Sequence, residues 1–332
     1  MIFDNILFHN VEELEKSEAG YIMWRVPESV RNGLDSLAAA EVSRYSTGIE
    51  LRFKIKGDSA ALILQAEEAL EAQVAYIYYG SIQGGWQNSS RIIGTSPTRI
   101  EIKKPDNMEI LHRITEEHQL PFSPEVVRVV LPYGNIHYIG VEGNVEVPGR
   151  DELPEKTYLA YGSSITHGSL ALAAPYTYPF RVAEKLKCDY INLGYAGSAH
   201  LEKSMAEYIV SRKDWDFATV ELGVNMLRED PVRFEENLDI FTEIISKDKR
   251  PVLATSIFGL NDPKDMKTAE KYRGLVEKYT KERLTFVDGL ELLNNPAYIS
   301  QDMVHPSIAG MDELANKWFY HLSLLLNRGD RR

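Results

Sequence analysis

This sequence of 332 residues predicts two domains of different class. A β-sandwich or jelly roll is expected over residues 1–150, and an α/β domain built on a parallel sheet over residues 151–332. Three observations predict this division. Apolar and polar residues alternate through the first part, strand, loop and helix patterns repeat through the second, and the polar, proline-containing segment 147–156 (VPGRDELPEK) lies between them.

Short strands account for most of the first part. In residues 47–56, Ile49, Leu51, Phe53 and Ile55 alternate with charged side chains, which is typical of a strand with one buried face. Residues 28–44 are expected to form a short helix. Further strands, many of them separated by Gly, Pro, Asn or Asp, are expected at 60–65, 73–79, 97–102, 110–115, 126–132 and 136–141. Short strands at this spacing predict a sandwich or a jelly roll.

The second part alternates strands with helices. Strands are expected at 157–161, 189–193, 217–222, 251–257 and 284–288. Apolar residues at helical spacing lie between them, and a last helical pattern begins at Ile308. Because parallel strands need crossover connections, these units predict a parallel sheet with helices on both faces. Ligands bind beyond the carboxyl ends of the strands in such sheets, so the chemistry is expected there.

Composition and charge exclude several classes of protein. The formal net charge is −12, and acidic residues exceed basic ones in both parts. A nucleic-acid or anionic-membrane partner is therefore not expected. The N-terminus does not resemble a signal peptide, and no apolar stretch approaches the roughly 20 residues that span a bilayer, so a cytoplasmic location is predicted. The single cysteine, Cys188, is expected to be a buried structural thiol.

A serine follows the first strand of the second part. Residues 162–168 (GSSITHG) place Ser164 just beyond a buried strand with glycines on both sides, so that its hydroxyl is presented at the carboxyl edge. An ordinary strand-to-helix turn would also use these residues. The next two strands end in 192–197 (NLGYAG) and 222–225 (LGVN), where glycine allows close backbone approach and Asn225 offers side-chain N–H donors.

An aspartate and a histidine lie three residues apart before the last helix. Asp302 can turn back on its loop and accept a hydrogen bond from Nδ1 of His305, which leaves Nε2 free to act as a base. A lone D-x-x-H is common, and Asp302 alone would suit a turn. The order and the placement of the four signals at strand ends are what make them specific.

At these residues the sequence resembles the SGNH/GDSL hydrolases. The resemblance covers about residues 156–325 and implies a flavodoxin-like, three-layer α/β/α domain. It rests on four blocks in order, which are Gly162-Ser163-Ser164, Gly197, Gly223-x-Asn225 and Asp302-x-x-His305. Two residues depart from the family pattern: Ser163 replaces the usual Asp, and Met226 stands where many members have Asp. The substrate therefore cannot be carried over from lipases.

The resemblance implies a mechanism for ester cleavage. Ser164 would be the nucleophile, His305 the base and Asp302 the residue that orients it. The backbone N–H groups of Ser164 and Gly197 and the side-chain amide of Asn225 would form the oxyanion hole. No cofactor is expected. A metal site built from His167, His200 and His305 lacks any close ligand spacing and is not expected either.

The first part resembles the N-terminal β-sandwich of carbohydrate esterase family 2-like enzymes. This layout implies a small acyl group, such as acetyl, on a sugar or another polar alcohol. Trp86, in the glycine-rich segment 80–87, is a candidate for stacking on a sugar ring, although it would equally pack under its own loop. Tyr176 and His200 are further candidates for substrate contact. Tyr178 is assigned either to the cleft or to the core face of its helix, and His167 is expected to point away or to line the cleft.

Three functions remain open at this point. A small-acyl esterase, most specifically a carbohydrate deacetylase, is the leading hypothesis. An acyltransferase would form the same acyl-enzyme and pass the acyl group to an alcohol instead of water. A non-catalytic carbohydrate-binding protein would need a decayed site, which the presence of Ser164, Asp302 and His305 argues against.

Overall fold

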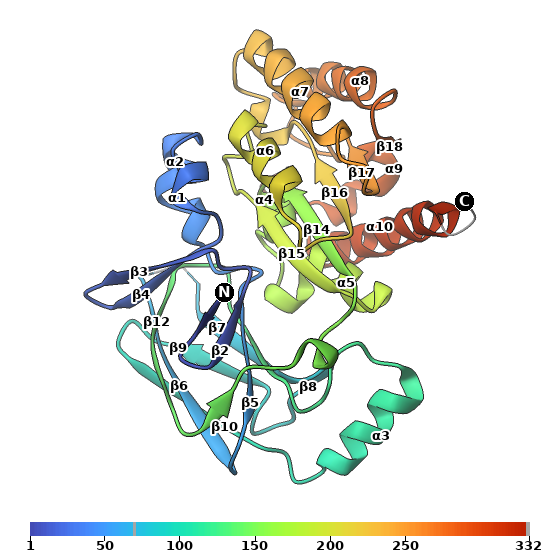
Figure 1. Ribbon diagram of the computed structural model, residues 1–332. Coiled ribbons are helices and arrows are strands. Elements are labelled where there is room, and N and C mark those ends of the chain that lie inside the picture. Colours follow the sequence, from blue (N-terminus) through green and yellow to red (C-terminus); the bar gives the residue numbers. More distant parts are fainter. Residues whose placement is uncertain (69–70, 330–332) are drawn as a thin grey trace.

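The computed structural model describes residues 1–68 and 71–329 and contains three sheets (Figure 1). Two are antiparallel and are built from residues before 147, and the third is parallel and begins at Thr157. This confirms the predicted fold class. None of the helices in these described residues is long and apolar enough to cross a membrane.

The first antiparallel sheet has eight strands. Six follow the order β1-β2-β5-β11-β7-β8, while β13 also pairs with β5 and β9 with β7. Their bounds are β1 (Ile2–Phe3), β2 (Ile6–His9), β5 (Glu50–Ile55), β7 (Gln73–Tyr79), β8 (Ile82–Gln83), β9 (Ser90–Ile93), β11 (Val127–Val130) and β13 (Val145–Glu146).

The second antiparallel sheet has five strands in the order β10-β6-β12-β4-β3. Their bounds are β3 (Glu13–Ser17), β4 (Gly20–Trp24), β6 (Ser59–Ala66), β10 (Thr98–Lys103) and β12 (Ile136–Glu142). One apolar core joins Phe53 and Ile77 of the first sheet to Leu62 and Tyr138 of the second. The two sheets therefore form a sandwich.

Two expectations for this part are corrected by the structure. Residues 110–115 are not a strand but lie within helix α3 (Met108–His118). Ile110 is exposed, whereas Leu111 is buried and Met108 packs against the core, so the buried positions follow a helical period. The single helix expected over 28–44 is three short ones, α1 (Glu28–Arg31), α2 (Ser36–Ala40) and η1 (Val42–Arg44).

The parallel sheet has the strand order β15-β14-β16-β17-β18, which is the flavodoxin-like order. Its strands are β14 (Thr157–Gly162), β15 (Asp189–Gly194), β16 (Phe217–Glu221), β17 (Val252–Thr255) and β18 (Thr285–Val287). The first two pair in register, with Leu159 opposite Ile191. All five strands therefore point their carboxyl ends to one rim.

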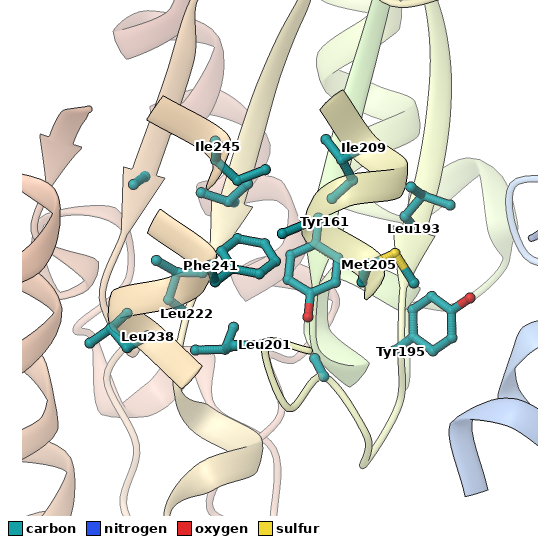
Figure 2. Close-up of a cluster of buried hydrophobic side chains, with 14 of the residues drawn as sticks. Tyr161, Leu193, Tyr195, Leu201, Met205, Ile209, Leu222, Leu238, Phe241 and Ile245 are labelled. Carbon is teal, nitrogen blue, oxygen red and sulfur yellow. The ribbon is translucent and has the colours of Figure 1, made fainter. Parts of the chain in front are cut away.

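Helices cover both faces of this sheet. On one face α6 (Lys203–Ser211), α7 (Pro231–Ser246) and α8 (Met266–Thr280) share a core with the strands, and Figure 2 shows Tyr161 of β14 stacked on Phe241 of α7. On the other face lie α5 (Tyr178–Leu186) and α10 (Ile308–Gly329). The short helices α4 (Ser164–His167), η3 (Ala174–Tyr176), η4 (Val224–Met226), α9 (Gly289–Leu292) and η5 (Pro296–Tyr298) lie in the connections.

Local sequence explains where the helix α7 begins. The side chain of Asp230 accepts the backbone N–H of Val232 at 2.9 Å, and Pro231 takes the first helical position, where no hydrogen bond from its nitrogen is needed. Phe234, Leu238 and Phe241 then recur on the buried face. The helix is thus defined by its cap and its apolar stripe.

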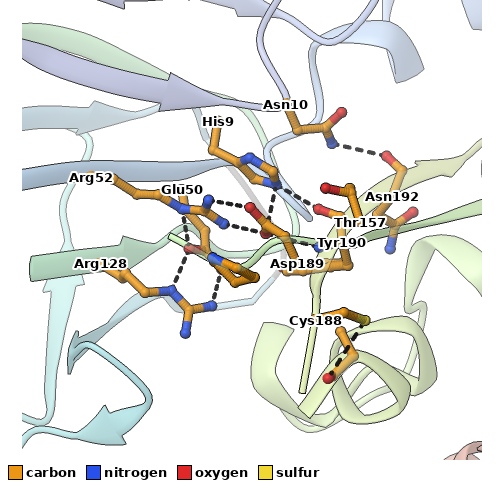
Figure 3. Close-up of polar contacts among 12 residues, drawn as sticks. His9, Asn10, Glu50, Arg52, Arg128, Thr157, Cys188, Asp189, Tyr190 and Asn192 are labelled. Carbon is orange, nitrogen blue, oxygen red and sulfur yellow. Dashed lines mark hydrogen bonds and ion pairs between the residues drawn. The ribbon is translucent and has the colours of Figure 1, made fainter. Parts of the chain in front are cut away.

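A buried ionic network joins the sandwich to strand β15 (Figure 3). Arg52 on β5 donates to both carboxylate oxygens of Asp189 on β15, at 2.6 and 2.7 Å, and also to Glu50. Arg128 on β11 donates to Glu50 at 2.7 and 2.8 Å. All four side chains are buried. The sandwich therefore covers the edge of the parallel sheet through charged pairs as well as through apolar contacts.

Candidate active site

Ser164 follows the first strand of the parallel sheet at a narrow turn. Strand β14 ends at Gly162, Ser163 caps α4 by accepting the N–H of Ile165 at 3.2 Å, and Ser164 is the first residue of α4. A Cβ at Gly162 would lie 2.2 Å from Oγ1 of Thr166, so only glycine fits there. Close packing of the turn holds Ser164 at the carboxyl rim of the sheet.

The structure brings the serine, the histidine and the aspartate together. Nε2 of His305 lies 2.8 Å from Oγ of Ser164, and Nδ1 lies 2.6 Å from Oδ2 of Asp302. The other oxygen of Asp302 accepts the backbone N–H groups of Val304 and His305 at 3.0 and 2.9 Å. Although burial opposes its ionisation, these hydrogen bonds lower the pKa of Asp302. The carboxylate is therefore ionised at neutral pH, and it orients His305 through both the ring Nδ1 and the backbone N–H.

The expected oxyanion donors line the same cavity. This cavity has a volume of about 530 Å³ and is lined by Ser164, Gly197, Asn225, Asp302 and His305, among others. Gly197 has a φ of 67°, which favours glycine. The side-chain oxygen of Asn225 accepts the N–H of Ala199 at 3.0 Å. Because that N–H can only donate, the contact fixes the amide with its NH₂ group directed away, free to donate to a ligand.

A buried glutamate that was not predicted from the sequence lies under the turn that carries Ser164. Glu221, the last residue of β16, is 1% exposed and accepts the backbone N–H of Ser163 at 2.8 Å and its hydroxyl at 2.7 Å. The hydroxyl of Thr166 donates to the same carboxylate at 3.1 Å. Burial raises the pKa of Glu221. Two features of the sequence could have indicated it. Glu221 is the single acid of a mostly apolar strand, and Ser163 stands where the family pattern has Asp, so that a carboxylate is missing from the turn itself.

The other two histidines of the rim are engaged elsewhere. His167 is fully buried against the ring of Tyr133, 4.7 Å between centroids, and its Nδ1 faces the N–H of Ala196 at 3.4 Å. Burial lowers its pKa well below the usual value, so it is neutral. His200 contacts Asp35 through Nδ1. Neither lines the cavity around Ser164, and the two share no partner with His305.

One cluster of side chains has the composition of a metal site. Ligand atoms of Asp35, His200 and Glu202 lie within 4.8 Å of one another. Arg233, however, donates to both oxygens of Asp35, at 3.1 and 2.9 Å. A guanidinium already balances the charge of this carboxylate, so the cluster does not fit a resident cation well.

The aromatic candidates for substrate contact lie outside the cavity around Ser164. Trp86 is fully exposed and Tyr176 is partly exposed, within 5.8 Å of the guanidinium of Arg181. Neither lines that cavity. Tyr178 is buried on the core face of α5, and its hydroxyl pairs with Thr166 at 2.7 Å. Substrate contact by Trp86, Tyr176 and His200 therefore stays a prediction.

Part of the chain is similar to a known protein family. Residues 160–312 match the model of the GDSL-like lipase/acylhydrolase family. No curated protein matches the sequence. The fold is similar to that of the salicylyl-acyltransferase SsfX3 of a tetracycline biosynthetic pathway, with a TM-score of 0.73, 16% identity and coverage of 97% of this chain and 95% of that one.

Two further solved structures share both parts of the fold. A putative GDSL-like lipase from Bacteroides ovatus has a TM-score of 0.67 and 16% identity, covering 97% of this chain and 98% of that one. A family two carbohydrate esterase from Cellvibrio japonicus has a TM-score of 0.64 and 11% identity, covering 98% and 96%. At such low identities the similarity shows a shared fold alone, and the coverage shows that this fold extends over nearly the whole chain.

Proposed function

We propose that this chain is a carboxylic ester hydrolase of the GDSL-like lipase/acylhydrolase type, whose family model matches residues 160–312, and that it acts through an acyl-enzyme on Ser164. The observation that carries the proposal is the chain of contacts from Asp302 to His305 at 2.6 Å and from His305 to Ser164 at 2.8 Å. A nucleophile, a base and an orienting carboxylate in this geometry are what serine hydrolysis requires.

The proposed reaction proceeds in two halves. Oγ of Ser164 attacks the ester carbonyl as Nε2 of His305 takes its proton, and Asp302 stabilises the imidazolium. The N–H groups of Ser164 and Gly197 and the amide of Asn225 bind the oxyanion. His305 then gives its proton to the leaving alcohol, and the acyl group stays on Ser164. Water attacks the acyl-enzyme in the same way, releasing the acid and restoring the hydroxyl.

The proposed substrate is a small acyl ester, such as an acetate, of a sugar or similarly polar alcohol. Polar side chains at the cavity rim, Arg228 and Asp265, support a polar alcohol. A solved relative, the family two carbohydrate esterase from Clostridium thermocellum, was determined in complex with cellohexaose, and its TM-score to this chain is 0.61 at 12% identity. That ligand belongs to the relative and is the basis of an analogy only.

The test is a panel of p-nitrophenyl esters from acetate to octanoate, run beside acetylated xylose and glucose. We expect turnover to fall with acyl length and to disappear in Ser164→Ala. A fluorophosphonate should label the wild type and not this variant. Wild-type turnover in Ser164→Ala would refute the proposal, and long acyl esters preferred over acetate would refute the small-acyl part.

Acyl transfer is the second candidate. It is favoured by the similarity in fold to a salicylyl-acyltransferase, which extends over 97% of this chain. The same acyl-enzyme would be resolved by an alcohol instead of water. Product analysis with p-nitrophenyl acetate and an added sugar distinguishes the two: acetate alone indicates hydrolysis, and an acetylated sugar indicates transfer.

A further inference from the structure

We propose that Arg25, which follows strand β4 of the sandwich, is a positioning residue for the oxyanion hole of the α/β domain. It acts through residues 192–197, in which strand β15 ends and the donor Gly197 follows. The proposal rests on the proposed esterase function, because the oxyanion role of Gly197 belongs to that function. The sandwich is then part of the catalytic arrangement as well as a neighbour of the cavity.

The guanidinium of Arg25 holds the backbone at the end of β15. It is fully buried, and it donates to the carbonyl oxygens of Asn192 and Gly194, each at 3.0 Å. A third hydrogen bond, of 2.7 Å, goes to the carbonyl of Val42 in the short helix η1. The same group lies over the ring of Tyr195, 5.0 Å from its centroid. The rigid fork of the guanidinium thus fixes two carbonyls of one strand end relative to the sandwich.

No carboxylate balances the charge of Arg25. Within residues 1–68 and 71–329 it forms no ion pair, and its Nε has no hydrogen-bond partner. Burial lowers the pKa of this guanidinium. A buried charge without a counter-charge costs free energy, and apolar residues of similar volume are often no less stable than buried charges. Stability of the fold alone therefore does not account for an arginine here, whereas the placing of three carbonyls by one rigid group does.

The other side of the same segment is tied to helix α4, whose first residue is the nucleophile. The side-chain amide of Asn192 donates to the carbonyl of Thr166 at 2.9 Å, and its oxygen accepts the N–H of Gly194 at 2.8 Å. A Cβ at Gly194 would lie 2.2 Å from the backbone nitrogen of His167, so the two backbones meet closely. The N–H of Ala196 donates to Nδ1 of His167 at 3.4 Å. The segment is therefore held from both sides.

Gly197 lies in a tight turn that begins directly after the carbonyl that Arg25 holds. The N–H of Ser198 donates to the carbonyl of Tyr195 at 3.1 Å, and Gly197 has a φ of 67°, as the third residue of a type II turn requires. Such a turn has little freedom of its own, so the direction of the N–H of Gly197 follows the backbone at Gly194. A guanidinium that fixes Gly194 therefore sets the direction of the oxyanion donor.

Apolar contacts bring the sandwich segment against the same turn. A Cβ at Gly197 would lie 3.9 Å from Cδ2 of Leu37 on α2. Val30 of α1 and Ala38 of α2 are buried in one core with residues of α6, and Figure 1 shows α1 and α2 beside that helix. Apolar packing is not directional, so it brings the turn into contact but does not aim its N–H. The hydrogen bonds of Arg25 supply that direction.

The test replaces Arg25 with methionine, an unbranched side chain without donors. We expect kcat on p-nitrophenyl acetate to fall by about 10- to 100-fold, because a misplaced oxyanion donor is weakened and not removed. KM should change little, since the oxyanion forms only along the reaction and not in the bound substrate. The Ki of methaneboronic acid, which forms a tetrahedral adduct with a catalytic serine, should rise by the factor by which kcat/KM falls. Partial unfolding would lower kcat but leave this Ki unchanged.

Two further variants separate positioning from charge and from stability. Arg25→Lys keeps the charge but lacks the planar fork, so its kcat and its boronate Ki should lie between those of the wild type and of Arg25→Met. Arg52→Met is the matched control. It removes another buried arginine that joins the sandwich to β15, at Asp189, the opposite end of the strand. It should lower the stability and leave kcat and the boronate Ki within about twofold of the wild type.

Hydrogen exchange adds a readout without turnover. The amides of residues 195–199, compared with those of strand β17, should exchange faster in Arg25→Met and should not do so in Arg52→Met. This comparison removes the effect of global stability, because global unfolding exposes both segments together. Faster exchange confined to residues 195–199 indicates that Arg25 holds this turn.

Three outcomes would overturn the positioning role. They are a kcat loss in Arg25→Met without a matching rise in the boronate Ki, equal losses in Arg25→Met and Arg52→Met, and full activity in Arg25→Lys, which also decides if Arg25→Met does not fold. A wild type without p-nitrophenyl acetate turnover and without fluorophosphonate labelling would instead contradict the proposed esterase. Exchange then still decides whether Arg25 holds the turn: faster exchange of residues 195–199 supports it, and unchanged exchange refutes it.

Discussion

Replacing Ser163 by aspartate is expected to destabilise the turn that carries Ser164. The hydroxyl of Ser163 donates to Glu221 at 2.7 Å, and both residues are buried. An aspartate at this position, which is the usual family residue, would set a second carboxylate against the first. In this protein the single carboxylate at the turn therefore comes from Glu221 on β16, and the hydroxyl of Ser163 donates to it.

The magnitude follows from the geometry. Two unit charges about 4 Å apart repel by about 4 kcal/mol at an effective dielectric constant of about 20. This energy is equivalent to a rise of about 3 in the pKa of one carboxyl group, so the pair takes up a proton as the pH falls. Ser163→Asp should therefore be about 4 kcal/mol less stable than the wild type at pH 8, and the deficit should shrink toward pH 5.

Denaturant unfolding at both pH values measures this free energy, and two variants control it. Ser163→Ala loses a hydrogen bond to a charged acceptor, which costs about 1.5–3 kcal/mol, without introducing a second acid. Its deficit should change less between pH 8 and pH 5. Ser163→Asp/Glu221→Gln should be more stable than Ser163→Asp alone, because it again has a single carboxylate at this turn. A Ser163→Asp protein as stable as the wild type at pH 8 would refute this reasoning. A double variant less stable than Ser163→Asp would refute it as well.

Further expectations concern the reaction, the domain contact and the surface. Ser164→Ala should lower kcat on p-nitrophenyl acetate by about 10⁶, whereas Asn225→Ala should lower it by about 10²–10³ and leave a measurable remnant; equal losses would contradict the oxyanion role. Arg52→Met should cost about 3–5 kcal/mol of unfolding free energy at pH 7, because it removes the guanidinium that donates to both oxygens of the buried Asp189; a loss below 1 kcal/mol, measured with urea, would contradict this. Burial alone would raise the pKa of Glu50, but the neighbouring arginines lower it to about 2. The contribution of ionised Glu50 to the unfolding free energy is therefore complete above about pH 5 and is lost as the pH falls toward 2. An unfolding free energy that stays flat over this pH range would contradict this. Trp86→Ala should leave kcat/KM on acetylated sugars unchanged, since this side chain is fully exposed and outside the cavity; a fall of tenfold would return it to the substrate site.

Local sequence determined the fold class and the order of the candidate site residues. Four of the five parallel strands are mostly apolar runs that end in Gly162, Gly194, Glu221 and Thr255, and parallel strands necessarily present their carboxyl ends at one rim. Ser164, Gly197 and Asn225 could be placed there without a structure for this reason. Asp302 and His305 are three residues apart, so their contact depends on a single loop.

The strand predicted at 110–115 was wrong although the local pattern favours a helix. These residues (ILHRIT) do not alternate in polarity as a half-buried strand would, whereas Met108, Leu111 and Ile114 recur every three residues, as they do in the helix α3.

Only the tertiary structure revealed the contacts that join distant segments. Arg52 and Asp189 are 137 residues apart, and Glu221 lies 58 residues from Ser163, so no local pattern pairs them. One cavity of about 390 Å³ is likewise lined both by Gln73 of β7 and by Ser169, which follows β14 and α4. The neighbours of a residue in sequence largely determine whether it joins a helix or a strand. The residues it pairs with, and the cavity it lines, depend instead on how the sheets pack, and no short stretch of sequence specifies that packing.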